Sequence, residues 1–411
     1  MSNNKINIHK IGILIAVFIA PFVSTSILTL LMILNLSCFI GKKIYDKDFN
    51  FEKTFLDKIL LLFCISIIFS TAMSKNIISS LQVAVMYFCI IGFYFMCVNE
   101  IKTEKTLYLI VKVLVISALI VSLYGIYQKI AGVYTPESWV DKEMFSDIQT
   151  RVYSTFKNPN VLGEYLVLLI PVTVSLFWHY EKITYKIGVI VVALSMTLCL
   201  LYTYSRGAWL GLLLATLVFA VLINKRMLLI VGLMILILPF ILPGSILNRF
   251  LSIGNISETS SSYRVLVWTS SLNMAKDYWI SGIGMGIDTF TKVYPLYAAK
   301  GVYVLHAHNV YIQILIELGI VGLISFIGII ALFYKEMLNC INKKDKNLSK
   351  LIIGISSGVA GFLFQGFVDN IWYNHRVSFI FWVLLSLGVI SQRLSNETLE
   401  SVNNDKGNTC N

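Results

Sequence analysis

The feature that most constrains this chain is a series of long apolar runs separated by short charged breaks. Hydrophobic residues fill 57% of the 411 positions and charged residues only 13%, against about 25% charged in an average soluble protein. A helix needs roughly 20 apolar residues to cross a bilayer, and about 17 can suffice. The repeated runs therefore predict an all-α, polytopic integral membrane protein. They argue against a disordered chain, a nucleic-acid-coating protein and an ordinary cytosolic enzyme.

We expect about 12 transmembrane helices in a single bundle domain, residues 1–394. Residues 11–40 leave two alternatives open: one long helix kinked at Pro21, or two helices that turn at Ser24-Thr25-Ser26. Residues 188–223 cannot form one helix, because it would be about 54 Å long. The chain must turn back at Ser205-Arg206-Gly207. The predicted spans are 11–22, 25–41, 56–73, 77–97, 106–130, 160–178, 184–203, 207–223, 227–242, 308–334, 349–368 and 374–393.

Lysine and arginine predict which loops face the cytoplasm. The clusters Lys42-Lys43 and Lys343-Lys344-Asp345-Lys346 assign their loops to the inner side of a cytoplasmic (inner) membrane. Much of the net charge of +11 then meets anionic membrane lipid, so it predicts no nucleic-acid partner. The polar segment 395–411 is predicted to be a disordered cytoplasmic tail.

Two segments on the outer side, 131–159 and 243–307, are too long for simple turns. Long structured loops on a rigid scaffold often carry function, so we expect 243–307 to be an extracytoplasmic catalytic loop with short helices. Within it, Val265, Trp268, Leu272 and Trp279 recur at helical spacing. This pattern predicts an amphipathic helix lying on the bundle or at the membrane interface.

Arg206 lies at the outer turn between two predicted spans, in Tyr202-Thr203-Tyr204-Ser205-Arg206-Gly207. A guanidinium in such an aromatic and hydroxyl setting is suited to bind phosphate through its fork of donors. The structural alternative is an interfacial anchor that extends to lipid headgroups.

Arg264 follows Ser260-Ser261-Ser262-Tyr263, where the amphipathic helix is expected to begin. Capping by Ser261 or Ser262 would leave amide groups and a positive dipole end near the arginine, which together favour an anion. A solvated arginine paired with an acid is the alternative.

His306 and His308 lie in Leu305-His306-Ala307-His308-Asn309, where the large loop enters the tenth span. A histidine can take or release a proton near neutral pH, which suits a base or an orienting group for a hydroxyl. A structural pair that caps the helix is the alternative. The HxH spacing lacks a third ligand and differs from HExxH, and the seven cysteines form no CxxC, so we expect no metal and no disulfide.

Further polar residues lie near the same outer surface. Glu317 is about nine residues into the tenth span, where an ionisable group is a functional or pairing candidate. Asp369 and Arg376 flank the last outer turn, and either contribute to the same cavity or pair with each other. The run Gly282–Gly286 does not follow a strand and is no dinucleotide fingerprint. No Walker loop or GxSxG elbow is present, so we expect no cofactor and a donor that carries its own activation.

Several of these blocks resemble the superfamily of O-antigen ligases and Wzy-type polymerases, over roughly residues 150–390. The resemblance implies a multispan glycosyltransferase that takes a glycan from a polyprenyl diphosphate carrier on the outer side of the membrane. The acceptor would be a hydroxyl on a lipid, a glycan or a protein, and no metal or nucleotide would be needed. The matching blocks are Arg151–Gly163, Tyr204–Leu210, Ser262–Trp268 with Gly282–Gly286, and His306–Leu323.

The resemblance also implies residue roles. Arg206 and Arg264 would hold the donor diphosphate, and His308 would activate or orient the acceptor hydroxyl. We expect further substrate contacts from His306, Asn309, Tyr311, Asp369 and Arg376.

Two other classes remain open. A transporter or flippase of lipid-linked glycan would need polar residues through the bilayer midplane, where Glu317 is nearly alone. A non-catalytic scaffold would leave the arginine and histidine blocks unexplained. The sequence does not distinguish a ligase from a polymerase.

Overall fold

The apolar runs fold into helices at all twelve predicted positions. The computed structural model describes residues 8–135, 150–253, 259–341 and 346–408, which form helices and no β-strand. Eight of these helices are long and apolar enough to cross a membrane, so the chain is an all-α, multi-pass membrane protein. They are α2 (Thr25–Tyr45), α4 (Ile77–Glu100), α5 (Glu104–Ile130), α7 (Ile183–Tyr202), α8 (Arg206–Ile223), α13 (Val310–Ile341), α14 (Lys346–Gln365) and α15 (His375–Asn408).

Four predicted spans are shorter helices of 12 to 17 residues. The total of twelve spans therefore stays a prediction. These helices are α1 (Ile8–Ile19), α3 (Asp57–Ala72), α6 (Pro159–Ser175) and α9 (Met227–Ile241).

The N-terminal segment forms two helices rather than one kinked helix. Helix α1 ends at Ile19, and Ser24 caps α2 by accepting a hydrogen bond from the amide of Ile27. The two helices pack against each other. The turn at Ser24 is therefore the alternative that the structure supports, because the serine supplies a local N-cap.

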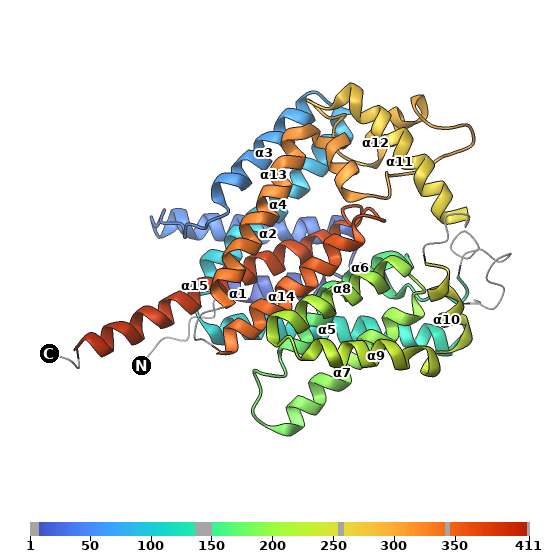
Figure 1. Cartoon of the computed structure of the whole chain (residues 1–411). Coiled ribbons are helices and arrows are strands. Elements are labelled where there is room, and N and C mark those ends of the chain that lie inside the picture. Colours follow the sequence, from blue (N-terminus) through green and yellow to red (C-terminus); the bar gives the residue numbers. More distant parts are fainter. Residues whose placement is uncertain (1–7, 136–149, 254–258, 342–345, 409–411) are drawn as a thin grey trace.

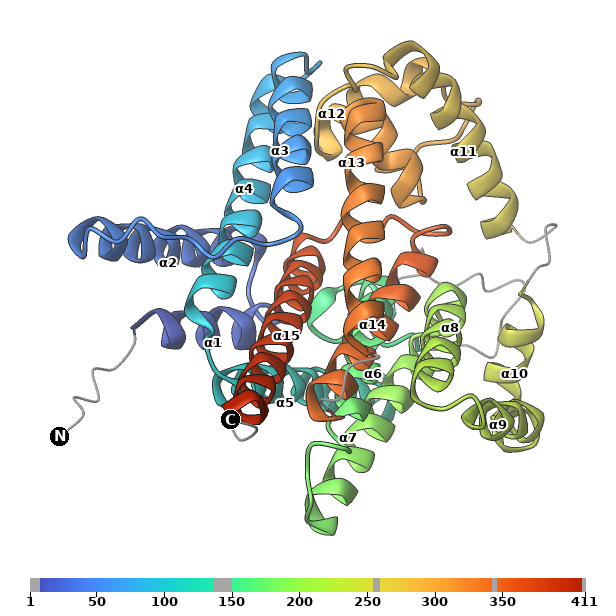
Figure 2. The same cartoon turned by 60° about the vertical axis from the view of Figure 1, so that its left-hand side comes forward.

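The innermost part of the bundle is built around α14 and α15. In the 18-residue apolar stretch of each helix, 78% and 89% of the residues are buried. Helix α14 packs against α6 and α8 (Figures 1 and 2). A Cβ on Gly358 would lie 2.2 Å from the carbonyl oxygen of Leu168 in α6, and one on Gly361 would lie 2.3 Å from that of Gly211 in α8. Small residues let these backbones meet. The packing fixes α6 and α8 against α14.

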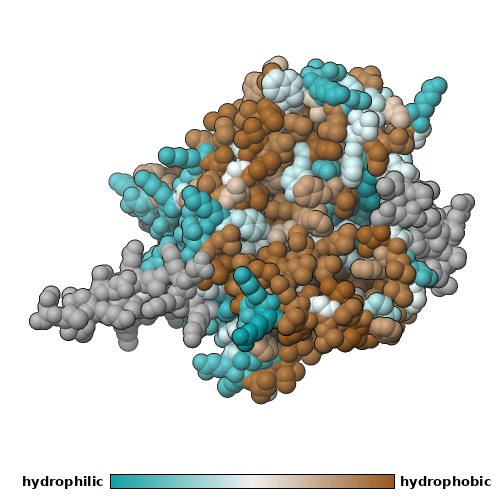
Figure 3. All heavy atoms as spheres, in the orientation of Figure 1, coloured by the Kyte–Doolittle hydropathy of each residue, from teal (hydrophilic) through white to brown (hydrophobic). Residues whose placement is uncertain are grey.

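The outer helices present apolar side chains to the surroundings. In the 18-residue apolar stretches of α2 and α7, only 17% and 22% of the residues are buried. Hydrophobic atoms cover much of the face seen in Figure 3, whereas hydrophilic atoms gather towards its edges. Such a large exposed apolar surface is expected where lipid replaces water.

The two chain ends lie at one end of the molecule, and α10 (Gly244–Leu251) lies at the other (Figure 1). The predicted outer loop 243–307 forms α10, α11 (Thr259–Tyr278), α12 (Ile287–Val293) and the 3-10 helix η3 (Tyr294–Leu296). Helices α11, α12 and η3 share an apolar core that is separate from that of the bundle, which includes Val267, Met274, Phe290 and Ala307 and extends to Ile316 of α13. Ile246 of α10 belongs to the core of the bundle instead.

Helix α11 leaves the apolar face that the sequence predicted exposed, so of the two predicted alternatives it does not pack this face on the bundle. The helix is present, but Val265, Leu272 and Trp279 of the predicted apolar face are 45% to 53% exposed. The buried side is instead formed by Val267 and Met274. The helix therefore packs on the core of its own loop and turns the predicted face outwards. Ser261 and Ser262 lie inside the helix, which starts at Thr259, so they do not occupy its N-cap.

The C-terminal segment also differs from the prediction. Residues 395–408 continue α15 as a helix, although 395–411 was expected to be disordered. Extending an existing helix avoids the cost of nucleation, and Arg393 pairs with Glu397 one turn later. Lys343, Lys344 and Asp345 of the predicted cytoplasmic cluster lie outside the described residues.

Candidate active site

Four arginines that are far apart in the sequence meet near α10. Arg206 is the first residue of α8, Arg249 lies in α10, and Arg264 lies in the second turn of α11. Arg151 precedes the 3-10 helix η2 (Ser154–Phe156). Arg206 Nη1 donates hydrogen bonds of 3.1 Å to the carbonyl and hydroxyl oxygens of Ser252, which caps the C-terminus of α10. This contact joins the start of α8 to the outer loop.

Arg151 is the most buried of the four, at 7% exposed. Its Nε donates to the carbonyl oxygen of Thr203 at 2.9 Å, and its Nη2 donates to Asn160 Oδ1 at 3.1 Å. Burial lowers the pKa of Arg151 to about 9, and the charges of the other three arginines act in the same direction. The carboxylate of Asp369 opposes them. The four guanidinium groups therefore share one electrostatic environment.

This environment favours an anion. Like charges that gather in partly buried positions repel each other, and a ligand with several anionic oxygens would relieve the repulsion through charge-assisted hydrogen bonds. Arg264 Nε is a buried donor that lacks a hydrogen-bond partner among the described residues. The cluster can thus offer positive charge and, at Arg264 Nε, a hydrogen-bond donor to a phosphate-bearing ligand.

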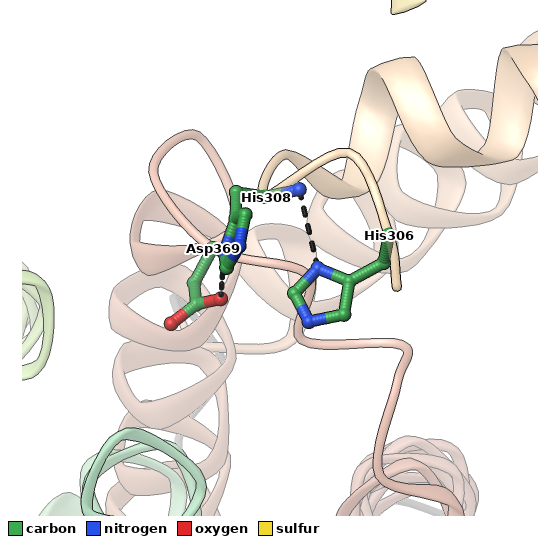
Figure 4. A group of neighbouring side chains, drawn as sticks. All are labelled: His306, His308 and Asp369. Carbon is green, nitrogen blue, oxygen red and sulfur yellow. Dashed lines mark hydrogen bonds and ion pairs between the residues drawn. The ribbon is translucent and has the colours of Figure 1, made fainter. Parts of the chain in front are cut away.

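Beside the arginines, the His306–His308 loop faces the turn after α14. His308 Nδ1 lies 3.4 Å from Asp369 Oδ1, and the His308 amide donates to His306 Nδ1 at 3.2 Å (Figure 4). Asp369 Oδ1 also accepts the amide of Asn370 at 2.9 Å. The two imidazole rings are 4.2 Å apart between centroids. The predicted alternative in which Asp369 pairs with Arg376 is wrong, since Asp369 pairs with His308.

The charges around this group set its protonation. Burial opposes ionisation of Asp369, but its hydrogen bond with His308 and the charges of His308 and Arg264 hold its pKa well below the ordinary value. Burial, followed by the effect of His308, lowers the pKa of His306 to about 3. Near neutral pH, Asp369 is a carboxylate and His306 is neutral.

The backbone at His308 is held in an unusual conformation. Its φ angle is +48°, in the left-handed region that costs a residue with a Cβ about 1 kcal/mol. Trp268 Nε1 of α11 donates to the His308 carbonyl oxygen at 3.2 Å. Helix α11 thus carries Arg264 on one turn and holds the histidine loop four residues later, which fixes the two groups relative to each other.

His306, His308 and Asp369 also provide one ligand atom each within 4.8 Å of one another. The third ligand that the sequence lacked is therefore present in space. However, the Nδ1 atoms of both histidines are used inside the group, and Arg264 lies near enough to affect the pKa of His306 and of Asp369. A nearby guanidinium disfavours a second cation. The group fits an oriented base better than a metal site.

Glu317 and Gln313 connect α13 to both neighbouring loops. Glu317 Oε1 accepts from Gln313 Nε2 at 2.9 Å and from the amide of Gly286 at 3.1 Å. Gln313 Oε1 accepts the amide of Ala307, between the two histidines, at 2.8 Å. Glu317 is therefore a buried pairing residue that positions the histidine loop.

The glycine run that the sequence left unassigned packs against a break in α13. Gly319 has φ +69° inside that helix, and the freed carbonyl oxygens of Ile316 and Glu317 accept the amides of Ile283 and Gly284. Gly282 must lack a side chain, because a Cβ would lie 2.2 Å from the Glu317 carbonyl oxygen. Broken helices at membrane depth need such partners for their backbone groups.

Three predicted substrate contacts are used elsewhere. Asn309 Oδ1 caps α13 by accepting the amides of Tyr311 and Ile312. The Tyr311 hydroxyl donates to the Leu363 carbonyl oxygen at 2.9 Å. Arg376 Nη1 donates to carbonyl oxygens in three segments, at Pro21, Val23 and Thr155. These hydrogen bonds hold the three side chains in the fold, and their contact with substrate stays a prediction.

The comparison with known proteins agrees with this site. Residues 190–327 match the O-antigen ligase family. The predicted resemblance is confirmed for this region, which is about a third of the chain. The region includes Arg206, Arg249, Arg264, His306 and His308.

The chain is also similar to a curated protein whose name includes a polysaccharide ligase. The chain is 26% identical over 147 residues to a Rickettsia conorii protein named "Putative polysaccharide ligase". The aligned region covers 33% of this chain and 33% of that relative. The chain therefore matches one third of the relative's length.

Sequence reasoning missed Arg151 and Arg249 as site residues. Arg249 lies in a short segment without a distinctive motif. Arg151 lies in a block that resembled the family, so that block was the available signal. Asn160, whose side chain binds Arg151, belongs to the same block.

Proposed function

We propose that the chain is a membrane glycosyltransferase that moves a glycan from a polyprenyl diphosphate carrier to a hydroxyl acceptor during cell-surface polysaccharide assembly. The observation that carries the proposal is the meeting of Arg151, Arg206, Arg249 and Arg264 beside the His308–Asp369 pair. The O-antigen ligase match supports the same class of substrate.

In this proposal the arginine cluster binds the diphosphate of the donor. A diphosphate leaves with increasing negative charge as its bond to the sugar breaks. Guanidinium groups that are already in place stabilise that charge without reorganisation. The outward face of the neighbouring helices gives the polyprenyl chain access to lipid.

His308 acts as the base in the proposed transfer. Its Nδ1 faces Asp369, which leaves Nε2 for the acceptor hydroxyl. The acceptor oxygen attacks the anomeric carbon, the bond from that carbon to the diphosphate oxygen breaks, and the hydroxyl proton passes to Nε2. Asp369 stabilises the resulting imidazolium. The products are the glycosylated acceptor and polyprenyl diphosphate, and the residues that act are those of this chain.

We place the site on the extracytoplasmic side of the cytoplasmic membrane, with residues 243–307 as the catalytic loop. The lysine pattern of the loops supports this orientation. A flippase would need polar groups along the midplane, whereas the arginines and histidines gather at the end of the bundle near α10.

The test uses purified full-length protein in lipid nanodiscs with a polyprenyl-diphosphate-linked glycan and candidate acceptors. We expect glycan transfer by the wild type and none by Arg264→Ala or His308→Ala, with all proteins equally folded. A single long glycan on a non-glycan acceptor would indicate a ligase, and a ladder would indicate a polymerase. Normal transfer by both variants would reject the proposed site.

A further inference from the structure

A second cavity reaches the histidine pair from a side that lacks the arginines. Its volume is about 170 Å³, and it lies between the starts of α4 and α15, the start of α12 and the histidine loop. His306 is part of its wall, whereas His308, Asp369 and the four arginines are not. The residues that line the cavity include Gln82, Asp288, His306, Glu317, Trp372 and Tyr373.

The chemistry of this cavity is the opposite of that of the arginine cluster. The lining contains the carboxyl groups of Asp288 and Glu317 and no lysine or arginine. Such a wall repels a phosphate and accepts hydrogen bonds from hydroxyl groups. The rings of Trp372 and Tyr373 add apolar faces with polar edges. This combination fits a neutral ligand that carries many hydroxyl groups, which is a sugar.

Two buried polar atoms in the wall have no hydrogen-bond partner among the described residues. Trp372 is 4% exposed and its Nε1 has no hydrogen-bond partner among the described residues. His375 lines the same cavity, and its Nδ1 is also buried without a partner among the described residues. A buried polar group without a partner costs about 1–3 kcal/mol. A bound hydroxyl group could satisfy such an atom.

The position of His306 connects this cavity to the reaction. Its ring contacts Tyr373 at 4.7 Å and His308 at 4.2 Å between centroids. A sugar in the cavity would therefore reach the histidine pair from one side while the diphosphate reaches it from the other. A glycan transfer requires the donor and the acceptor to be held on either side of the reacting groups.

We infer that this cavity binds the terminal sugar of the glycan acceptor. The inference rests on the proposed function and adds the chemical class of the acceptor and the residues that recognise it. Gln82 and Asp288 are exposed residues of the rim, so they can be changed without disturbing the core. We expect the sugar to bind weakly, because each of its hydrogen bonds to the protein replaces one to water.

The experiment measures two kinds of binding to the full-length protein in nanodiscs. The probes are polyprenyl diphosphate without a glycan, and oligosaccharides released from the surface polysaccharide of the source cell. We expect the wild type to bind both probes at once. Combining Gln82→Ala with Asp288→Ala should weaken oligosaccharide binding at least tenfold and leave polyprenyl diphosphate binding unchanged, and Arg264→Ala should do the reverse. Thr291→Val, on the same short helix and outside the cavity, is the control.

The outcomes separate the two proposals. Unchanged oligosaccharide binding in the double variant, competition between the two probes, or no oligosaccharide binding by the wild type would overturn the acceptor cavity. In those cases the proposed function stands if polyprenyl diphosphate still binds and glycan is still transferred. If the wild type binds no polyprenyl diphosphate, the proposed function itself fails.

Discussion

Asp369 and His308 are 61 residues apart in the sequence, yet Asp369 Oδ1 lies 3.4 Å from His308 Nδ1. The pair joins the turn after α14 to the loop before α13. It fixes which ring nitrogen of His308 faces the protein, and so which one faces a substrate. The account of the reaction depends on this orientation.

Replacing Asp369 should therefore impair chemistry more than binding. We expect Asp369→Asn to lower the rate of glycan transfer about 100-fold or more, because an amide cannot stabilise the imidazolium. Polyprenyl diphosphate binding should change little. Asp277→Asn is the matched control, since Asp277 is an acid that accepts a hydrogen bond from Tyr297 outside the site. Equal rates for the two variants would contradict the role of Asp369.

Replacing an arginine of the cluster should impair donor binding. Loss of a hydrogen bond to a charged group costs about 1.5–3 kcal/mol, so Arg249→Ala should weaken polyprenyl diphosphate binding about 10- to 100-fold. Arg226→Ala is the control, because Arg226 is exposed in the turn between α8 and α9. Titration of labelled polyprenyl diphosphate measures both. Similar affinities in the two variants would exclude Arg249 from the donor site.

Because His306 is neutral in the folded protein, the free energy of unfolding should depend on pH. Burial lowers the pKa of His306 from 6.5 to about 3. Between these values the unfolded chain binds the proton and the folded chain does not, so stability is present above pH 6.5 and is lost as the pH falls towards 3. We expect the melting temperature of His306→Gln to fall less than that of the wild type from pH 7 to 4. Parallel curves would mean that His306 is not buried in the neutral form.

The break in α13 should tolerate no side chain at Gly319. Its φ is +69°, and a Cβ would lie 2.3 Å from the carbonyl oxygen of Ile280. Overpacking costs about 1–3 kcal/mol, so Gly319→Ala should lower the melting temperature and the yield of folded protein. At Gly188 nothing lies within 4 Å of the added Cβ, and Gly188→Ala should be neutral or stabilising by about 1 kcal/mol. The opposite order would contradict the packing of the glycine run.

Glycan transfer should need no metal ion. Glycan transfer should be unchanged by EDTA, because the arginines supply the positive charge at the leaving group. Loss of activity with EDTA and its recovery with Zn²⁺ would instead assign His306, His308 and Asp369 as ligands. His306→Gln would then lower zinc affinity, which calorimetry can measure.

The sequence predicted the helices well for a simple physical reason. A backbone in lipid must satisfy its own hydrogen bonds, so long apolar runs have little choice of structure. The turn at Ser205-Arg206-Gly207 followed from length alone, and α8 begins at Arg206. The buried side of α11, with Val267 and Met274, was not predicted, because the sequence does not show that the outer loop has its own apolar core.

The site was predictable only in part. Arg206, Arg264, His306 and His308 lie in distinctive blocks, and the charge pattern assigned them to one side. The convergence of Arg151 and Arg249 depends on how α10 and the segment before η2 pack, which no local pattern encodes. For Asn309 and Arg376 the sequence predicted substrate contacts, which stay predictions, and it did not reveal that both residues also bind the backbone. Their backbone partners become visible only in three dimensions.

The most direct test is a structure of the full-length protein in nanodiscs with polyprenyl diphosphate bound. We predict density for the diphosphate among Arg151, Arg206, Arg249 and Arg264, within reach of His308. Density for the diphosphate at another place, away from the four arginines, would contradict the central claim.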